Sequence, residues 1–284
     1  MTGINQILKR RQTLSVELWP PRSEEALVKL ENSLQKLGAL DIDFASITYG
    51  AGGTTRDRTH DLVVNIHKQQ KMTPMAHLTC AYHSKQELID ILERYKAEGI
   101  ENILALRGDP PVNKEADFVE GELKFAKDLA ILAKEVGDFI VAVAAHPEGK
   151  DQAQEARYLF DKLQIADFAI TQLFFDAKQY KDFMEKIDAL GNTKPILPGI
   201  MPITSAKSLM TMARLTNQEV PPYLSDKVSL LKDNPEDVRM FGIEFATQMS
   251  AELLEFGVPG LHFYTMNETN ATIEICKNLR YHIL

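Results

Sequence analysis

The sequence predicts an α/β fold of the (β/α)8 or TIM-barrel type, in which eight parallel strands form a barrel surrounded by helices. Eight short apolar runs rich in β-branched residues recur along the chain, at 13–18, 44–48, 75–79, 103–106, 139–145, 168–172, 196–200 and 261–264. Most of these runs are followed by a stretch whose apolar residues have helical spacing. Strands that alternate with helices indicate a parallel sheet, and eight of them indicate a closed barrel.

Residue spacing and caps define the helices between these strands. The first begins after Ser23, a residue type favoured at helix N-caps, and Glu24 and Glu25 follow in its first turn. The longest covers 235–256, with a proline in its first turn, and Gly257 ends it. Helical spacing also predicts helices at 58–70, 84–98, 124–135, 152–163, 178–190 and 205–215.

Two segments interrupt this alternation of strands and helices. Residues 110–121 are polar and should form a surface loop. Residues 217–234 contain two consecutive prolines and are too long for a simple connection, so we expect them to cap the barrel or cover its site. No repeat, low-complexity tract or linker divides the chain, so residues 1–284 are expected to form a single domain.

Composition and charge limit the classes of partner. Hydrophobic residues make up 44% of the chain, and the net charge of −8 argues against nucleic acid and anionic membranes as partners. No apolar stretch approaches the roughly 18 residues of a membrane span. The two cysteines, Cys80 and Cys276, form no CxxC pair and are expected to be reduced, which indicates the cytoplasm. The histidines show no HxH or HExxH spacing, so no metal site is expected.

Glu17 is a carboxylate near the end of the first apolar strand. Burial raises the pKa of such a group, and a glutamate tuned toward neutral pH can donate a proton. The alternative is an ion pair with a structural arginine or lysine inside the barrel. Pro20 and Pro21 end the strand and stiffen its exit, which favours a positioned side chain.

Other polar groups stand within or just beyond later strands. The second strand leads into a glycine-rich turn at 50–53, which permits close approach of the backbone to a flat or phosphorylated ligand, although glycines also serve ordinary turns. His77 lies within the third strand, either as a core residue or as a ligand contact. Gln172 ends the sixth strand, and its amide suits the edge of a pterin or nicotinamide as well as buried backbone groups.

The fourth strand ends in a cation, a glycine and an anion. Arg107 and Asp109 flank Gly108, and two prolines then direct the chain outward. The two charges either close the turn as a local pair or act on ligands. In the second case Asp109 contacts a polar heterocycle, while Arg107 faces a phosphate or carboxylate.

Seven motifs resemble, in order, those of the methylenetetrahydrofolate reductase family of the bacterial single-domain type. They lie at 14–22, 46–52 with 56–60, 76–80, 106–109, 170–176, 198–203 and 262–267, and the likeness covers nearly the whole chain. The resemblance implies reduction of 5,10-methylenetetrahydrofolate to 5-methyltetrahydrofolate by NADH or NADPH through bound FAD, in a ping-pong cycle. Family members are often dimers or tetramers, so the resemblance also allows a homo-oligomer.

The resemblance further implies roles for individual residues. Glu17 would be the general acid that opens the bridging ring to give the 5-iminium cation, Asp109 would lie near pterin and flavin, and Gln172 would bind the pterin. Substrate-binding positions would be Asp109, Gln172, Ser208 and Met212. Cofactor-binding positions would be Thr48, Tyr49, Ala51, His77, Arg107, Gly108, Asp109, Ala126, His146, Glu155, Tyr158 and Lys162.

Departures from the family pattern cluster around the fifth helix and its entry. His146 replaces a usual aromatic residue and the loop after it is shorter. Of the positions at Glu155, Tyr158, Asp161 and Lys162, only Lys162 is plainly retained. These changes support an alternative in which NAD(P)H passes hydride directly to the folate iminium without flavin. A non-catalytic regulatory subunit is a further alternative, which the retained Glu17 disfavours.

Overall fold

The computed structural model describes residues 3–49, 56–69, 72–109, 119–216 and 218–283. Its centre is a closed barrel of parallel strands in which each strand pairs with the next and the last pairs with the first. The strands are β1 (Thr13–Leu18), β2 (Phe44–Ile47), β3 (Thr73–Thr79), β4 (Asn102–Leu106), β5 (Ile140–Ala145), β6 (Phe168–Leu173), β7 (Ile196–Ile200) and β8 (Gly260–Tyr264). The predicted (β/α)8 fold is therefore confirmed.

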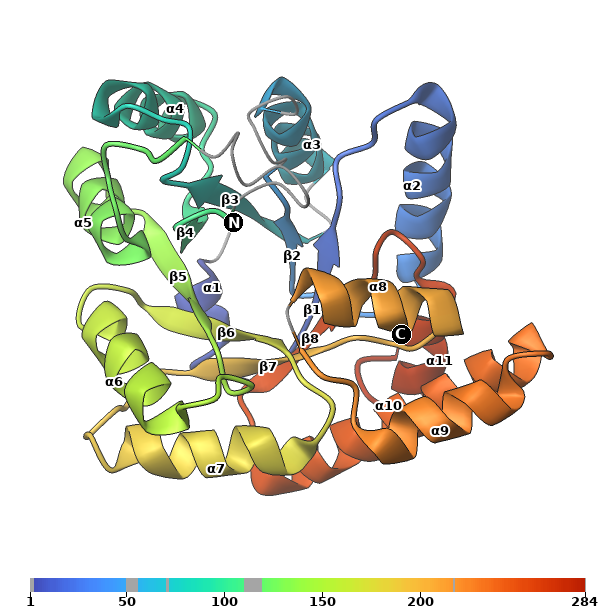
Figure 1. Ribbon diagram of the computed structural model, residues 1–284. Coiled ribbons are helices and arrows are strands. Elements are labelled where there is room, and N and C mark those ends of the chain that lie inside the picture. Colours follow the sequence, from blue (N-terminus) through green and yellow to red (C-terminus); the bar gives the residue numbers. More distant parts are fainter. Residues whose placement is uncertain (1–2, 50–55, 70–71, 110–118, 217, 284) are drawn as a thin grey trace.

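Helices surround this barrel, as Figure 1 shows. After α1 (Ile4–Ile7) they are α2 (Glu24–Leu37), α3 (Arg56–Gln69), α4 (Lys85–Ala97), α5 (Ala126–Val136), α6 (Gln152–Leu163), α7 (Ala177–Asp188), α8 (Ala206–Leu215), α9 (Pro222–Leu231), α10 (Pro235–Phe256) and α11 (Asn270–Leu279). The predicted caps are present: the Ser23 side chain accepts a hydrogen bond from the Ala26 N–H, and Gly257 ends α10 with φ +91°. A left-handed residue at this position favours glycine.

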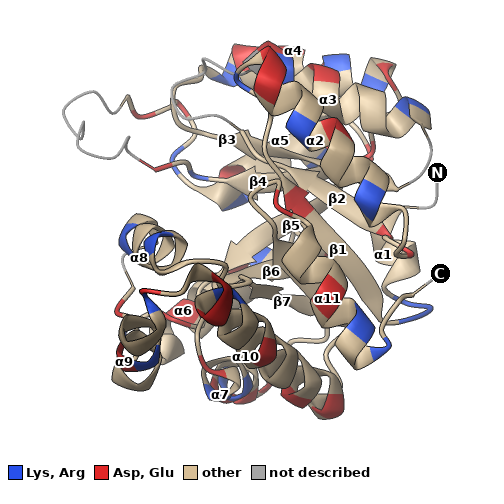
Figure 2. Ribbon diagram, turned by 90° about the vertical axis from the view of Figure 1, so that its right-hand side faces the viewer, with Lys and Arg blue, Asp and Glu red and all other residues tan. Residues whose placement is uncertain are grey.

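The amino half of the barrel interior is filled by apolar side chains. They are Ile4, Phe44, Met75, Leu104, Ala142, Phe168, Ile170 and Leu197. Helix α1 closes this end, because Ile4 is fully buried and its N–H donates to Asn102 Oδ1 at 3.2 Å. Figure 2 shows α1 on the side opposite α8.

A second apolar cluster covers the carboxyl ends of β6 and β7. It joins Leu173 and Met201 to helices α8 and α9 and to the start of α10. The segment expected to cap the barrel contains α9, and the Tyr223 hydroxyl donates to the Phe175 carbonyl at 2.7 Å. Most of the loop predicted at 110–121 lies outside the described residues. Within the described ranges every helix is too short or too polar to cross a bilayer.

Candidate active site at the carboxyl ends of the strands

A polar layer lies above the apolar filling of the barrel. His262 on β8 is buried, with Nδ1 at 2.8 Å from Ser15 Oγ and Nε2 at 3.4 Å from Ser46 Oγ. Burial, reinforced by His77, lowers the pKa of His262 to about 3. The ring is therefore neutral, and its two hydroxyl neighbours fix its orientation below the strand ends.

Glu17 lies near the carboxyl end of β1 with only 14% of its side chain exposed. Trp19 Nε1 donates to Glu17 Oε1 at 3.0 Å, and Glu17 Oε2 lies 3.8 Å from His77 Nε2. Burial raises the pKa of Glu17 to about 7, although the indole hydrogen bond acts in the opposite direction. Across the described part of the chain, no arginine or lysine forms an ion pair with Glu17, so the structural ion-pair interpretation is not supported.

His77 is both a buried strand residue and a group with unused hydrogen-bonding capacity. Burial lowers the pKa of its imidazole to about 3, so the ring is neutral. Its Nε2 atom is buried and has no hydrogen-bond partner among the described residues. A buried polar atom without a partner is unusual and suits a ligand contact.

Tyr264 lies within the motif at 262–267, to which the sequence assigned no role. It is the register partner of Glu17 across the β1–β8 pair, and its hydroxyl donates to the Thr171 carbonyl. Burial, together with the negative charges of Glu17 and Glu148, raises the pKa of Tyr264 well above its ordinary value. The alternation in β8 gives the signal, because His262 and Tyr264 point to the same interior face.

Gly199 on β7 makes room for the Tyr264 ring. A Cβ atom at Gly199 would lie 2.5 Å from a Tyr264 ring carbon and 2.7 Å from the hydroxyl oxygen. It would also lie 2.5 Å from the Thr171 carbonyl oxygen, and all three distances are shorter than side-chain carbons tolerate, so this position needs glycine. The glycine thus supports a residue of the adjacent strand.

The turn after β4 holds the three predicted residues in a conformation that glycine makes possible. Gly108 has φ +88°, and a Cβ atom there would lie 2.8 Å from the Ala81 Cβ. Arg107 and Asp109 are exposed on either side of it, and Arg107 Nε donates to the Gly108 carbonyl at 3.4 Å. The turn therefore presents both charges at the strand end.

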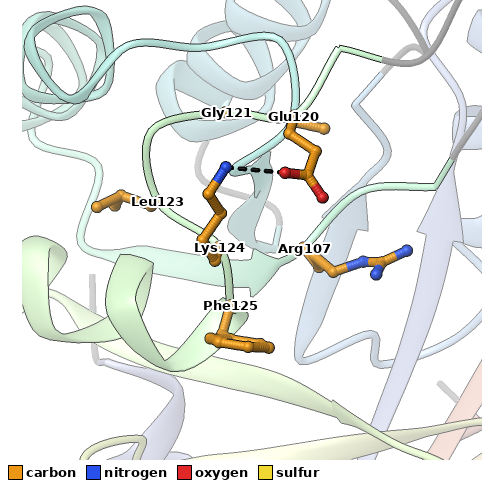
Figure 3. Close-up of a pocket in the computed structure, with 7 residues that line it drawn as sticks. Arg107, Glu120, Gly121, Leu123, Lys124 and Phe125 are labelled. Atoms are coloured by element: carbon orange, nitrogen blue, oxygen red, sulfur yellow. Dashed lines mark hydrogen bonds and ion pairs between the residues drawn. The ribbon is translucent and has the colours of Figure 1, made fainter.

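A cavity of about 270 Å³ lies beside Arg107. It is lined by Ala81, Arg107, Glu120, Gly121, Leu123, Lys124 and Phe125. Figure 3 shows the Phe125 ring at one edge and the Lys124–Glu120 ion pair, at 2.8 Å, at another. The Phe125 side chain is 66% exposed, which is unusual for phenylalanine, and Ala126 follows it as the first residue of α5. An exposed aromatic face next to cations can take a planar base and an anionic group.

The opposite side, between β5 and α6, carries the predicted residues that depart from the family. His146 Nδ1 lies 3.0 Å from Glu148 Oε1, and Glu148 Oε2 is buried with no hydrogen-bond partner in the described part of the structure. Lys162 Nζ donates to the Ala144 carbonyl, and burial lowers the pKa of Lys162 to about 8. The Lys162 ammonium therefore faces the end of β5.

Charges on the outer part of α6 are paired or exposed. Asp161 forms an ion pair with Lys127 of α5 at 2.7 Å, which offsets the negative charge that Asp161 brings to α6. Tyr158 is 56% exposed, and its hydroxyl accepts a hydrogen bond from Gln154 at 2.7 Å. Glu155 packs against Gly149 and favours the charged form of Lys162.

The remaining predicted residues have more local contacts. Gln172 is half-buried and its Oε1 accepts a hydrogen bond from the Leu173 N–H at 2.9 Å. The Ser208 hydroxyl donates to the carbonyl of Ser205, the N-cap residue of α8, at 2.8 Å. Met212 packs against the cluster around α8.

Two further predicted positions lie at the end of β2. The Thr48 carbonyl accepts a hydrogen bond from Thr59, and the Tyr49 hydroxyl lies 3.0 Å from His83 Nε2. Ala51 lies outside the described residues. In the described ranges, no three His, Cys, Asp or Glu side chains gather in a group that would hold a metal ion.

Known proteins are similar to this chain in sequence and in fold. The family model of methylenetetrahydrofolate reductase matches residues 3–280. The chain is 37% identical over 278 residues to 5,10-methylenetetrahydrofolate reductase of Pectobacterium carotovorum subsp. carotovorum, covering 96% of this chain and 91% of that protein. It is 35% identical over 288 residues to the Escherichia coli K12 enzyme of the same name, covering 98% and 95%.

Solved structures show the same architecture at lower sequence identity. An uncharacterised protein from Clostridium thermocellum, which binds two copies of 5-methyl-5,6,7,8-tetrahydrofolic acid, has a TM-score of 0.74 at 18% identity and covers 98% of this chain and 99% of its own. That likeness shows the fold, whereas the family model and the two bacterial relatives extend over nearly the whole sequence. The chain therefore belongs to the methylenetetrahydrofolate reductase family, oxidoreductases that use a nucleotide cofactor to reduce 5,10-methylenetetrahydrofolate.

Proposed function

We propose that Glu17 is the general acid of this reduction and that NADH or NADPH supplies the hydride through bound FAD. The observation that carries the proposal is the buried Glu17 carboxyl, whose pKa of about 7 leaves a large protonated fraction at neutral pH. A proton donor with such a pKa is well matched to its operating pH.

The chemistry needs a proton before it needs a hydride. Opening the bridging five-membered ring breaks a carbon–nitrogen bond, and the leaving nitrogen takes a proton from Glu17. The electron pair that remains on the other nitrogen forms the 5-iminium cation, and the iminium carbon then accepts the hydride. Protonation of the leaving nitrogen therefore produces the acceptor that the hydride requires.

The charge states of the groups at the carboxyl ends of the strands favour that cation. His77 and His262 are neutral because burial lowers the pKa of each to about 3, so neither adds a positive charge beside the iminium. Asp109, exposed after β4, supplies a negative charge, and Gln172 after β6 supplies an amide for the pterin. We assign the substrate-binding role to these two residues together with Ser208 and Met212.

The residues near β2, β3 and β4 fit a flavin nucleotide. The unpartnered His77 Nε2, the side-chain-free backbone of Gly108 and the Phe125 cavity offer a polar contact, a close backbone approach and an aromatic surface. When bound, FAD supplies a two-electron carrier between the nicotinamide and the folate. The residues that would hold it are Thr48, Tyr49, Ala51, His77, Arg107, Gly108, Asp109 and Ala126.

The β5–α6 side supports a second candidate, direct hydride transfer without flavin. His146, Glu155 and Tyr158 bring no permanent cation to that wall, and the Lys162 ammonium is bonded to the Ala144 carbonyl. A diphosphate bound there would face the carboxylates of Glu148 and Glu155, and close pairs of like charge are unfavourable.

The visible spectrum of the purified protein separates the two candidates. A flavin spectrum with ping-pong kinetics for NAD(P)H and methylenetetrahydrofolate is expected for the FAD route. A colourless enzyme that is active without added flavin, with sequential kinetics, would contradict it. The same rate measurements with each nucleotide decide between NADH and NADPH.

The two free cysteines are both buried, which supports a cytoplasmic location.

A further inference from the structure

We propose that Trp19 is a positioning residue that fixes which oxygen of Glu17 carries the acidic proton. The inference rests on the proposed role of Glu17 as the acid. Trp19 Nε1 lies 3.0 Å from Glu17 Oε1, and an indole N–H can only donate. Oε1 is therefore held as an acceptor, and the proton of the acid resides on Oε2.

The second oxygen faces the interior of the site. Glu17 Oε2 lies 3.8 Å from the unpartnered Nε2 of His77, a residue that points from β3 into the barrel. A proton on Oε2 is thus available to a ligand in the barrel mouth, whereas a proton on Oε1 would be directed at the indole. The Trp19 contact selects the productive one of two equivalent oxygens.

Two side chains that follow β8 hold the backbone of Glu17 and Trp19 in place. Asn267 Oδ1 accepts a hydrogen bond from the Trp19 N–H, and Asn267 Nδ2 donates to the Trp19 carbonyl, each at 2.9 Å. The Thr265 hydroxyl donates to the Glu17 carbonyl at 2.7 Å and accepts from the Asn267 N–H at 3.2 Å. Three of these bonds hold the two ends of the segment from Glu17 to Trp19, and the fourth joins Thr265 to Asn267, so the backbone directs the indole at the carboxyl group.

The electrostatic surroundings of Glu17 give the removal of the indole a definite sign. His77 on β3 and His262 on β8 are neutral, Tyr264 on β8 is an uncharged phenol at neutral pH, and Glu148 is a second carboxylate near Tyr264. The indole N–H is the hydrogen-bond donor that favours the ionised form of Glu17. Loss of this donor therefore raises the pKa of Glu17.

The test is the pH dependence of folate reduction in Trp19→Phe. We expect the alkaline limb of the kcat profile to move upward by about one pH unit, because a hydrogen bond to a charged group is worth roughly that much. We also expect kcat on the acid plateau to fall about twofold, because the proton then distributes over two equivalent oxygens and only half of the acid carries it on Oε2. Tyr281→Phe removes an aromatic donor that bonds the Thr13 carbonyl at the amino end of β1, the end opposite the site, and should keep the wild-type profile.

Failure of this inference differs from failure of the proposed function. If Glu17→Gln retains folate reduction, the acid has been assigned to the wrong residue. If Glu17→Gln is inactive while Trp19→Phe keeps the wild-type profile and plateau, Glu17 remains the acid and the positioning role of Trp19 is wrong.

A second measurement does not depend on the Trp19 variant. Trp19 is the single tryptophan of the chain, so indole fluorescence reports on this contact alone. In the wild-type protein without substrate, we expect one fluorescence transition near pH 7, the pKa of Glu17, and no such transition in Glu17→Gln. The same transition in both proteins would overturn the proposal.

Discussion

Glu17 Oε2 lies 3.8 Å from His77 Nε2, yet the two residues do not form an ion pair at neutral pH. Burial raises the pKa of Glu17 to about 7 and lowers the pKa of His77 to about 3. Both shifts favour the uncharged form, because a charge loses hydration in the interior. The barrel mouth therefore holds an acid beside a neutral base, and neither proton state is set by a partner of opposite charge.

Replacement of Glu17 by Gln should abolish most of the folate reduction and preserve ligand binding. The amide keeps the size of the side chain but cannot donate an acidic proton, and general acid catalysis typically contributes about 100-fold to 10,000-fold in rate. Steady-state rates with methylenetetrahydrofolate measure the loss. Asp182→Asn is a matched control, since Asp182 pairs with Lys178 on the surface of α7 and its amide should retain full activity.

A wild-type protein without activity under any flavin supplement would support the regulatory-subunit alternative. Recovery of turnover on addition of a partner protein would strengthen that result.

The Glu17→Gln variant should also be more stable than the wild type above neutral pH. The folded pKa of Glu17 is about 7 against an ordinary value of 4.5, so the folded state binds more protons between these two values and loses stability as the pH rises through them. At pH 8 the gain in unfolding free energy in Glu17→Gln should reach up to about 3 kcal/mol, and at pH 4 it should be small. Urea unfolding at both pH values measures the difference, and an equal effect at both would contradict it.

Acid should destabilise the protein through its two buried histidines. His77 and His262 have folded pKa values of about 3 against an ordinary value of 6.5, so the unfolded state binds more protons in this window and stability falls as the pH decreases. Each histidine contributes up to about 1.4 kcal/mol per pH unit. Urea unfolding between pH 4 and 6 in the Glu17→Gln background avoids the opposing titration of Glu17, and adding His77→Gln should make the slope shallower.

Gly199→Ala should disturb Tyr264. Because the added methyl group would lie 2.5 Å from the ring, the ring must move, and such overpacking typically costs about 1–3 kcal/mol. We expect lower folate-reduction activity as well, since Tyr264 is the register partner of Glu17. The added methyl should cost less in a Tyr264→Ala background, where its clash with the Thr171 carbonyl, at 2.5 Å, remains but the clash with the ring is gone. Equal costs in the two backgrounds, measured by thermal unfolding of the four proteins, would contradict the Tyr264 contact.

The strands were predictable because their sequences carry an unambiguous signal. Both faces of a barrel strand are buried, so each strand is a continuous apolar run, and the limits of β1 and β7 are those expected from the sequence. Helices α1, α9 and α11 were not anticipated. The four residues of α1 are too few for a periodic pattern, and α9 begins at the second of two consecutive prolines, in a segment that was expected only as a long connection.

Side chains of the site were predictable where a strand displays an out-of-place polar group, as with Glu17 and His77. Trp19 and Tyr264 were not predicted because an aromatic residue at the end of an apolar run is typical of ordinary core. Phe125 was not predicted because a single aromatic residue after Lys124, at the start of a helix, forms no pattern. The hydrogen bonds between Trp19 and Asn267 join residues 248 positions apart, and only barrel closure brings β8 beside β1. The need for glycine at 199 likewise depends on a neighbouring strand.

The short helix at the start of the chain constrains how the reactants meet. Because Ile4 and the apolar filling close the amino end of the barrel in the described part of the structure, ligands reach Glu17 through the entrance at the carboxyl ends of the strands. The hydride donor and the folate must both use that entrance, so they either take turns in one place or stack face to face within it.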